Sequence, residues 1–213
     1  MINNDINKIK KNANDILDEI DKHNFLYVFI KSMHHSLKIN NVIISILITI
    51  LALILSLIKI GYSEDTITEF LPIIEVSNSI ALVMFGAIIM GYTIFQALAQ
   101  GPTLKEFLLN DDSNKSQFHS YNLSFFNTTV LYLFIIIINY ILIVIFKSIP
   151  KNWYLIYLDN NINNFIATTL ISIYFLVNIY SLLEVKSFIF NLYKCFSINA
   201  VANTIDIVKK DGE

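Results

Sequence analysis

Long stretches of apolar residues, separated by short polar segments, dominate the pattern of this chain. The stretch from Ile39 to Ile60 contains a single charge, Lys59, next to its last residue. A bilayer core of about 30 Å is crossed by about 20 apolar residues in a helix, and this stretch has that length. Backbone groups in lipid cannot bond to water, so such a segment must be helical. The pattern therefore predicts a membrane-spanning helix over residues 39–60.

Three further stretches have the same character and predict three further spans. They are residues 73–98, 125–146 and 165–183. Each is long enough to cross a bilayer at about 1.5 Å per residue. We therefore expect an all-α membrane protein with a four-helix transmembrane domain over residues 39–183. An amphipathic segment (residues 1–38) precedes this domain, and a helical segment (residues 184–213) follows it.

The placement of the lysines predicts the orientation of the spans. The chain has no Arg and fifteen Lys, of which twelve lie before the first span, between the second and third, or after the fourth. Cytoplasmic segments carry an excess of positive charge, so we expect both termini in the cytoplasm. The abundance of Ile, Asn and Lys is typical of low-GC bacterial coding. The expected location is therefore the bacterial inner membrane.

The N-terminal segment carries an apolar heptad pattern over about three heptads. Residues seven apart form two series, Ile2, Ile9, Ile16 and Ile6, Ala13, Ile20. Such a pattern is typical of helices that pair. The lysines of this segment are balanced by carboxylates, whereas a helix on a membrane surface is usually more basic. Two interpretations fit: self-association or docking on the protein's own C-terminal helix, and a simple interfacial helix.

Two breaks are expected outside the spans. Gly101 and Pro102 predict the end of the second spanning helix. Thr103 and Glu106 have the spacing of a capping box, which predicts a short helix over residues 103–109. The fourth spanning helix is expected to continue past the membrane. A break near Asn199 then precedes a last helix over residues 200–208.

One face of the second span has the order expected of a pore-lining helix. At 100° per residue this face holds Asn78, Leu82, Phe85, Ile89, Gln96 and Gln100. It is polar at both ends and apolar in the middle, so the apolar residues could form a hydrophobic gate that closes by dewetting. Glu75, near the outer end, could form a ring of carboxylates at the pore mouth in an oligomer. The alternatives are a face packed against other helices and a solvated Glu75.

Other polar and small residues predict contacts between helices. Ala87 and Gly91 form a small-xxx-small pair, which favours close helix packing. Asn139 and Asn178 are amides inside spans, and each needs a hydrogen-bond partner because burial of a lone amide is costly. Counting from the span ends places Asn139 nearer the outer side and Asn178 nearer the inner side, so we expect them to have separate partners. They either hold helices together or line an ion path.

The sequence lacks the signatures of several other functions. No Asp, Glu or Lys lies clearly at the centre of a span, which argues against a proton-coupled transporter. No metal-binding, phosphate-binding or nucleophile motif is present, so we expect no enzyme, no cofactor and no metal. A net charge of −2 without a basic stripe makes duplex nucleic acid an improbable partner. The single cysteine, Cys195, excludes an internal disulfide.

In size, span count and cytoplasmic helical ends, the whole chain resembles the four-span membrane components of bacterial anti-phage systems. These include the Kiwa membrane protein and the channel effectors of nucleotide-signalling systems. The resemblance implies a tetramer-like assembly that alters membrane permeability on infection, controlled by a cytoplasmic protein or small ligand. We expect a homo-oligomeric channel or pore-forming effector in the lipid bilayer. The alternatives are a non-conducting anchor that recruits a cytoplasmic partner, and a transporter or immunity subunit.

Overall fold

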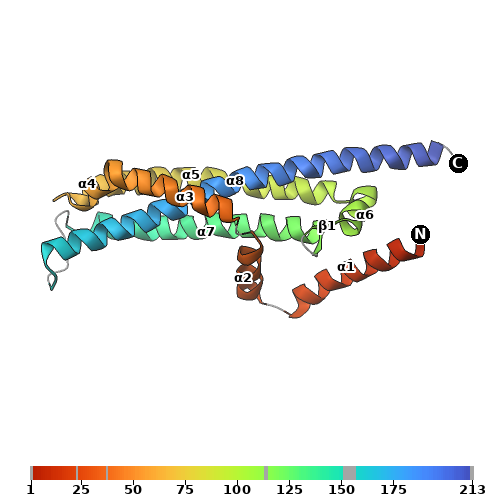
Figure 1. Ribbon diagram of the computed structural model, residues 1–213, viewed down its shortest axis with the longest axis horizontal. Coiled ribbons are helices and arrows are strands. Elements are labelled where there is room, and N and C mark those ends of the chain that lie inside the picture. Colours follow the sequence, from red (N-terminus) through yellow and green to blue (C-terminus); the bar gives the residue numbers. More distant parts are fainter. Residues whose placement is uncertain (1, 23, 37, 113–114, 151–156, 212–213) are drawn as a thin grey trace. The chain divides into compact units, whose positions relative to one another are not determined.

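Helices make up nearly all of the secondary structure. The computed structural model describes residues 2–22, 24–36, 38–112, 115–150 and 157–211 (Figure 1). Within these residues, four helices are long and apolar enough to cross a membrane. They are Ile39–Gly61, Thr66–Leu98, Gln117–Ser148 and Asn160–Lys209. The prediction of four spans in an all-α chain is confirmed at this level, and the four helices indicate a multi-pass membrane protein.

The chain divides into two compact units. Unit 1 consists of Met1–Leu37, Ala87–Val130 and Lys186–Glu213, and unit 2 of Lys38–Gly86 and Leu131–Val185. Three long helices, α5 (Thr66–Leu98), α7 (Gln117–Ser148) and α8 (Asn160–Asp211), contribute residues to both units. These units are defined by contacts within the chain. The predicted domain boundaries at residues 38 and 183 concern placement in the membrane, and they stay a prediction.

The first predicted span, in unit 2, is interrupted by one wide turn. It forms α3 (Ile39–Ala52), a π-helical turn η1 (Leu53–Leu57) and α4 (Ile58–Gly61). The next helix, α5, begins at Thr66, earlier than the predicted start at residue 73. The Thr66 hydroxyl donates to the carbonyls of Ile60 and Ser63, which fixes the short loop before α5. The polar first turns of α5 weaken its hydropathy signal, so the sequence pattern placed its start too late.

Outside the predicted spans, the expected short helix over residues 103–109 is confirmed with an earlier start. The capping box at Thr103 and the break near Asn199 are wrong, and one contact explains both. The Thr103 hydroxyl donates to Oδ1 of Asn199 at 2.9 Å, so Thr103 does not cap its own helix. The helix α6 (Gly101–Leu109) begins instead at Gly101. The φ of Gly101 is 51°, a left-handed conformation that glycine adopts easily, and it lets the chain turn between α5 and α6. Asn199, the expected break, lies inside the continuous helix α8. The Asn199 side chain accepts a hydrogen bond from Thr103 of α6, so it does not bond to the backbone of α8 and interrupt that helix.

Unit 1 also contains α1 (Ile2–Lys22), α2 (Phe25–Ser36) and a small hairpin of β1 (Asp111–Asp112) and β2 (Lys115–Ser116). The predicted N-terminal helix is confirmed. It contacts α6, where the Asn12 amide donates to the Leu108 carbonyl at 2.7 Å. Of the heptad residues, Ile6 is exposed, whereas Ile9, Ala13 and Ile16 are half-buried. The side chains of Ile2 and Ile20 lie outside the described residues.

The two units have different interiors. In unit 1, the fully buried ring of Phe95 lies against a group of other rings: Tyr92, Phe107, Phe118, Tyr121 and Phe125, with centroids 5.0 to 6.4 Å away. In unit 2, the buried apolar cluster consists of Leu57, Phe70, Ile74 and Ile171. Aromatic pairs at such distances add specific geometry to apolar burial. The interior of unit 1 is therefore built on one aromatic centre.

Candidate functional site in the membrane-length helices

A closed group of side-chain hydrogen bonds joins α5, α7 and α8 within unit 2. The Tyr174 hydroxyl donates to Oδ1 of Asn139 at 2.8 Å, and Nδ2 of Asn139 approaches the Ser77 hydroxyl oxygen at 3.5 Å. Ser77 donates to Oδ1 of Asn178, whose Nδ2 bonds to the Tyr174 carbonyl at 2.9 Å. We call these four residues the amide network. Since both amides are satisfied, the network holds three helices together.

The amide network corrects one prediction. Asn139 and Asn178 were expected to have separate partners at different depths, but both bond to Ser77. The residue count failed because α5 and α7 begin well before the predicted spans, at Thr66 and Gln117. Span ends defined by hydropathy therefore do not give the register between neighbouring helices. Of the two interpretations of these amides, the contacts support helix association.

A second buried polar contact, between α3 and α8, was missed by the sequence analysis. Glu184 is only 2% exposed, and one of its carboxylate oxygens accepts a hydrogen bond of 2.9 Å from the Asn41 amide. Glu184 thus lies inside a membrane-length helix, although the predicted fourth span ended one residue before it. Its donor Asn41 is a neutral amide, and acidic side chains inside membrane-length helices are rare.

A signal for this contact exists in the sequence. Asn41, Ser45 and Thr49 are spaced by four and are the buried residues of α3. Residues at that spacing share one helix face, so the first span has a polar stripe directed at another helix. The Ser45 and Thr49 hydroxyls bond to backbone carbonyls of α3 itself. The Asn41 amide instead donates a hydrogen bond to Glu184 of α8.

The predicted pore-lining face of α5 is the less buried of its two faces. Exposed fractions are 52% for Leu82 and 42% for Ile89, and Gln96 is also exposed. The prediction was wrong for Gln100: α5 ends at Leu98, and Gln100 has an extended backbone at the start of α6, so it does not continue this helix face. Phe85 and Asn78 are half-buried, and Oδ1 of Asn78 is buried without a donor among the described residues. The other face holds the buried residues Ile74, Ala81, Ile88 and Phe95. A single chain therefore leaves most of the predicted gate uncovered.

Two residues assigned to an oligomer make contacts within one chain. The Glu75 carboxylate forms an ion pair of 2.8 Å with Lys147, and both side chains are about half exposed. Such a pair is typical of a solvated helix end. Gly91 is buried, and a Cβ there would overlap the end of the Phe188 ring. Ala87, its small-xxx-small partner, is exposed.

Gln96 has a partner in unit 1. Its Nε2 donates to Oδ1 of Asn122 at 3.2 Å, and the Tyr92 hydroxyl donates to the same oxygen at 2.5 Å. This shared acceptor holds α5 to α7 and fixes the Gln96 side chain. Gln96 is therefore exposed but has a defined orientation.

In the part of the chain that the structure describes, no three His, Cys, Asp or Glu side chains come together as a metal site would need. Comparison with protein-family models, curated proteins and solved structures found no match to this chain. The function is therefore inferred from its own residues.

Proposed function

We propose that this protein forms a membrane channel from several copies, with α5 lining the path and both termini in the cytoplasm. One observation supports this most: α5 has a buried face and an exposed face, and the exposed face keeps its apolar middle and polar end. Leu82 and Ile89 form the apolar part, and Gln96 the polar end. This order is that of a hydrophobic gate next to a hydrated entrance.

Assembly follows from the energetics of the exposed face. Polar side chains in membrane helices usually face the protein interior or a water-filled cavity, because lipid offers them no hydrogen bonds. One chain leaves Gln96 exposed, so a second copy or a water-filled path would surround it. Closed rings of identical subunits provide both. A tetramer in the bacterial inner membrane, controlled by a cytoplasmic protein or small ligand in anti-phage defence, is the form that the resemblance implies.

A second candidate function is a non-conducting anchor, and the length of α8 favours it. At about 1.5 Å per residue, a helix of 52 residues extends far beyond a bilayer core of about 30 Å. The C-terminal part of α8 exposes the apolar side chains of Phe190, Tyr193, Val201 and Ile205. Exposed apolar faces of this kind mark interaction sites. A cytoplasmic partner held there would need no conduction.

The channel is tested by ion flux into liposomes that contain the purified full-length protein. Leu82→Asn and Phe85→Asn should increase the flux, because a hydrated constriction no longer dewets. The matched control is Val83→Asn, since Val83 is 71% exposed and lies outside the predicted gate face. Flux should remain at the wild-type level in this control. If the wild type and all three variants are silent, or if Val83→Asn acts like Leu82→Asn, the channel is contradicted and the anchor is favoured.

A further inference from the structure

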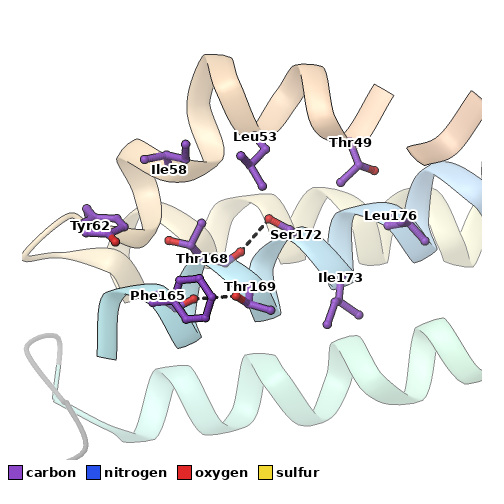
Figure 2. Close-up of a pocket in the computed structure, with 10 residues that line it drawn as sticks. All are labelled: Thr49, Leu53, Ile58, Tyr62, Phe165, Thr168, Thr169, Ser172, Ile173 and Leu176. Atoms are coloured by element: carbon purple, nitrogen blue, oxygen red, sulfur yellow. Dashed lines mark hydrogen bonds between the residues drawn. The ribbon is translucent and has the colours of Figure 1, made fainter. Parts of the chain in front are cut away.

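A cavity of about 460 Å³ lies within unit 2, between the first spanning segment and the beginning of α8. Figure 2 shows its lining, to which Leu53, Ile58, Ile173 and Leu176 contribute aliphatic side chains. Both bounding segments are long and apolar enough to cross a membrane. The surroundings of this cavity are therefore lipid hydrocarbon when the helices span a bilayer.

The π-helical turn and one close helix contact help to form the cavity. Leu53, the first residue of η1, lines it, and π turns are frequent at functional sites. Close by, Gly61 lies so near α8 that a Cβ there would come within 2.8 Å of Cα of Thr168. The helices thus touch at Gly61, and Leu53 lines the space that remains beside this contact.

The serine and threonine hydroxyls in the lining already have hydrogen-bond acceptors and do not require a polar ligand. Thr168, Thr169 and Ser172 donate to the carbonyls four residues earlier in α8, at 2.8, 2.8 and 2.7 Å. Their donors are used within the helix, so the side chains present mainly carbon to the cavity. Water needs two to four polar partners to occupy a cavity. An apolar chain therefore fits this space better than water does.

The two ends of the cavity differ. Figure 2 shows Tyr62 and Phe165 toward one end and Leu176 toward the other. Tyr62 is followed by a loop with exposed carboxylates at Glu64 and Asp65. Aromatic rings beside carboxylates attract a quaternary or primary ammonium, through the ring quadrupole and through charge.

Lys59 is an exposed cation in the same segment of the chain, between the lining residues Ile58 and Tyr62. A phosphate is the anion that such a lysine suits. The charges near the aromatic end therefore complement a zwitterionic head group, in which a phosphate is joined to an ammonium. A head group with no ammonium would meet the carboxylates without a compensating charge.

We propose that this cavity binds one acyl chain of a phospholipid whose head group carries an ammonium. The chain lies along Leu53, Ile173 and Leu176, and the head group lies at the end marked by Tyr62 and Phe165. The site requires only that the helices span a bilayer, and it is independent of whether the protein conducts.

The test uses full-length protein in phosphatidylglycerol vesicles that contain a trace of photoactivatable lipid. The probe is phosphatidylethanolamine or phosphatidylglycerol with the same diazirine-bearing acyl chain. Crosslinks mapped by mass spectrometry should fall in residues 165–176. The ethanolamine probe should label this segment about fivefold more than the glycerol probe, which is the ratio expected from one cation–π contact. Equal labelling by the two probes would overturn the proposal.

Filling the cavity gives a second, independent readout. Thr169→Phe should reduce labelling of residues 165–176 by the ethanolamine probe, because the ring occupies the space of the acyl chain. The matched control is Leu170→Phe, since Leu170 is 61% exposed and does not line the cavity. Ser172→Phe repeats the test at a second lining position. Unlabelled phosphatidylethanolamine should also displace the probe from the wild type. Labelling that persists in both filled variants, or that resists this competition, would show that the lipid lies elsewhere.

Discussion

Aromatic rings around Phe95 fill the interior of unit 1, whereas hydrogen bonds between side chains link the helices of unit 2. Phe95 and Phe125 lie 5.0 Å apart by ring centroids, and both are fully buried. Unit 2 has a buried apolar cluster that includes Phe70 and Ile74, but it also buries polar side chains between its helices: Asn139 fully and Glu184 nearly so. Both interiors are helical, yet different interactions stabilise them.

The difference follows from what surrounds each part of the chain. Unit 2 contains most of the predicted spans, where lipid tails are as apolar as the side chains that they contact. The hydrophobic effect then gives little drive for helix association, and hydrogen bonds and close packing replace it. Unit 1 contains α1, α2, α6 and the end of α8, which carry most of the lysines. The aromatic centre joins the end of the second predicted span, at Phe95, to α6 and to the start of the third predicted span, at Phe125. Ring contacts there add specific geometry to apolar packing.

The largest expected effect is loss of the aromatic centre of unit 1. Phe95→Ala should lower the free energy of unfolding by about 3–5 kcal/mol, because it removes a buried ring and leaves a cavity. Cys195 is the only cysteine and is fully buried in unit 1, so its reaction with maleimide reports on the opening of that unit. We expect faster labelling in Phe95→Ala. The exposed position Val83→Ala should leave the rate unchanged.

This variant also tests whether the two interiors are independent. Ser45→Cys, in a Cys195→Ser background, places a buried thiol in unit 2. Phe95→Ala should increase labelling of Cys195 more than labelling at position 45. Equal acceleration at both positions would mean that the units open together.

Glycine-to-alanine substitutions should have the next largest effect on stability, and they also compare the two interiors. Gly61→Ala should destabilise unit 2 by roughly 1–3 kcal/mol, because the new methyl meets backbone of Thr168 and the helices must separate. Gly91→Ala should have a smaller effect, since it meets only the end of the Phe188 ring, which can turn aside. The control Gly86→Ala has open space around it and should stabilise the helix by about 0.5–1 kcal/mol. Unfolding in mixed micelles measures all three, and a larger loss for Gly91→Ala would reverse the comparison.

Removal of the buried carboxylate should have an effect of similar or smaller size. Glu184→Ala leaves the Asn41 amide without its acceptor, at a cost of about 1–3 kcal/mol. Glu184→Gln keeps a carbonyl oxygen for Asn41 and should be milder. Labelling at Ser45→Cys, one turn from Asn41 on α3, should rise in the alanine variant and stay near the parental rate in the glutamine variant. Equal labelling of the two variants would show that the hydrogen bond does not stabilise this contact.

The smallest expected effect lies in the amide network. Tyr174→Phe deletes the hydroxyl that donates to Asn139 but keeps the ring contact with Phe70 at 5.3 Å between centroids. Hydrogen bonds between membrane helices contribute about 0.6 kcal/mol on average, so the loss in unfolding free energy should be of that order. A loss as large as that of Phe95→Ala would show that the network, and not apolar packing, dominates unit 2.

The spans could be predicted because a long apolar segment in lipid can satisfy its backbone hydrogen bonds within itself only as a helix. Helix extent could not, since hydropathy reports contact with lipid and not the length of the helix. This is why the start of α5 at Thr66 and the continuity of α8 through Asn199 were missed. Helical periodicity identified the face of α5 that holds Leu82 and Ile89, but its assembly stays a prediction. The meeting of Asn139 and Asn178 at Ser77 depends on the register between helices, which periodicity within one helix does not contain.

The wide turn Leu53–Leu57 sets the rotational phase of the first span. The buried and half-buried residues before and after it are spaced by four from Asn41 to Gly61. In a straight α-helix that spacing would drift by about 200° over the segment, turning Gly61 away from the helix that Asn41 faces. One additional residue in the turn takes back about 100° of this drift. Asn41 can therefore bond to Glu184 while Gly61 touches Thr168, both on α8. Deletion of one residue within the turn would bring these two contacts out of phase, although the segment would stay equally apolar.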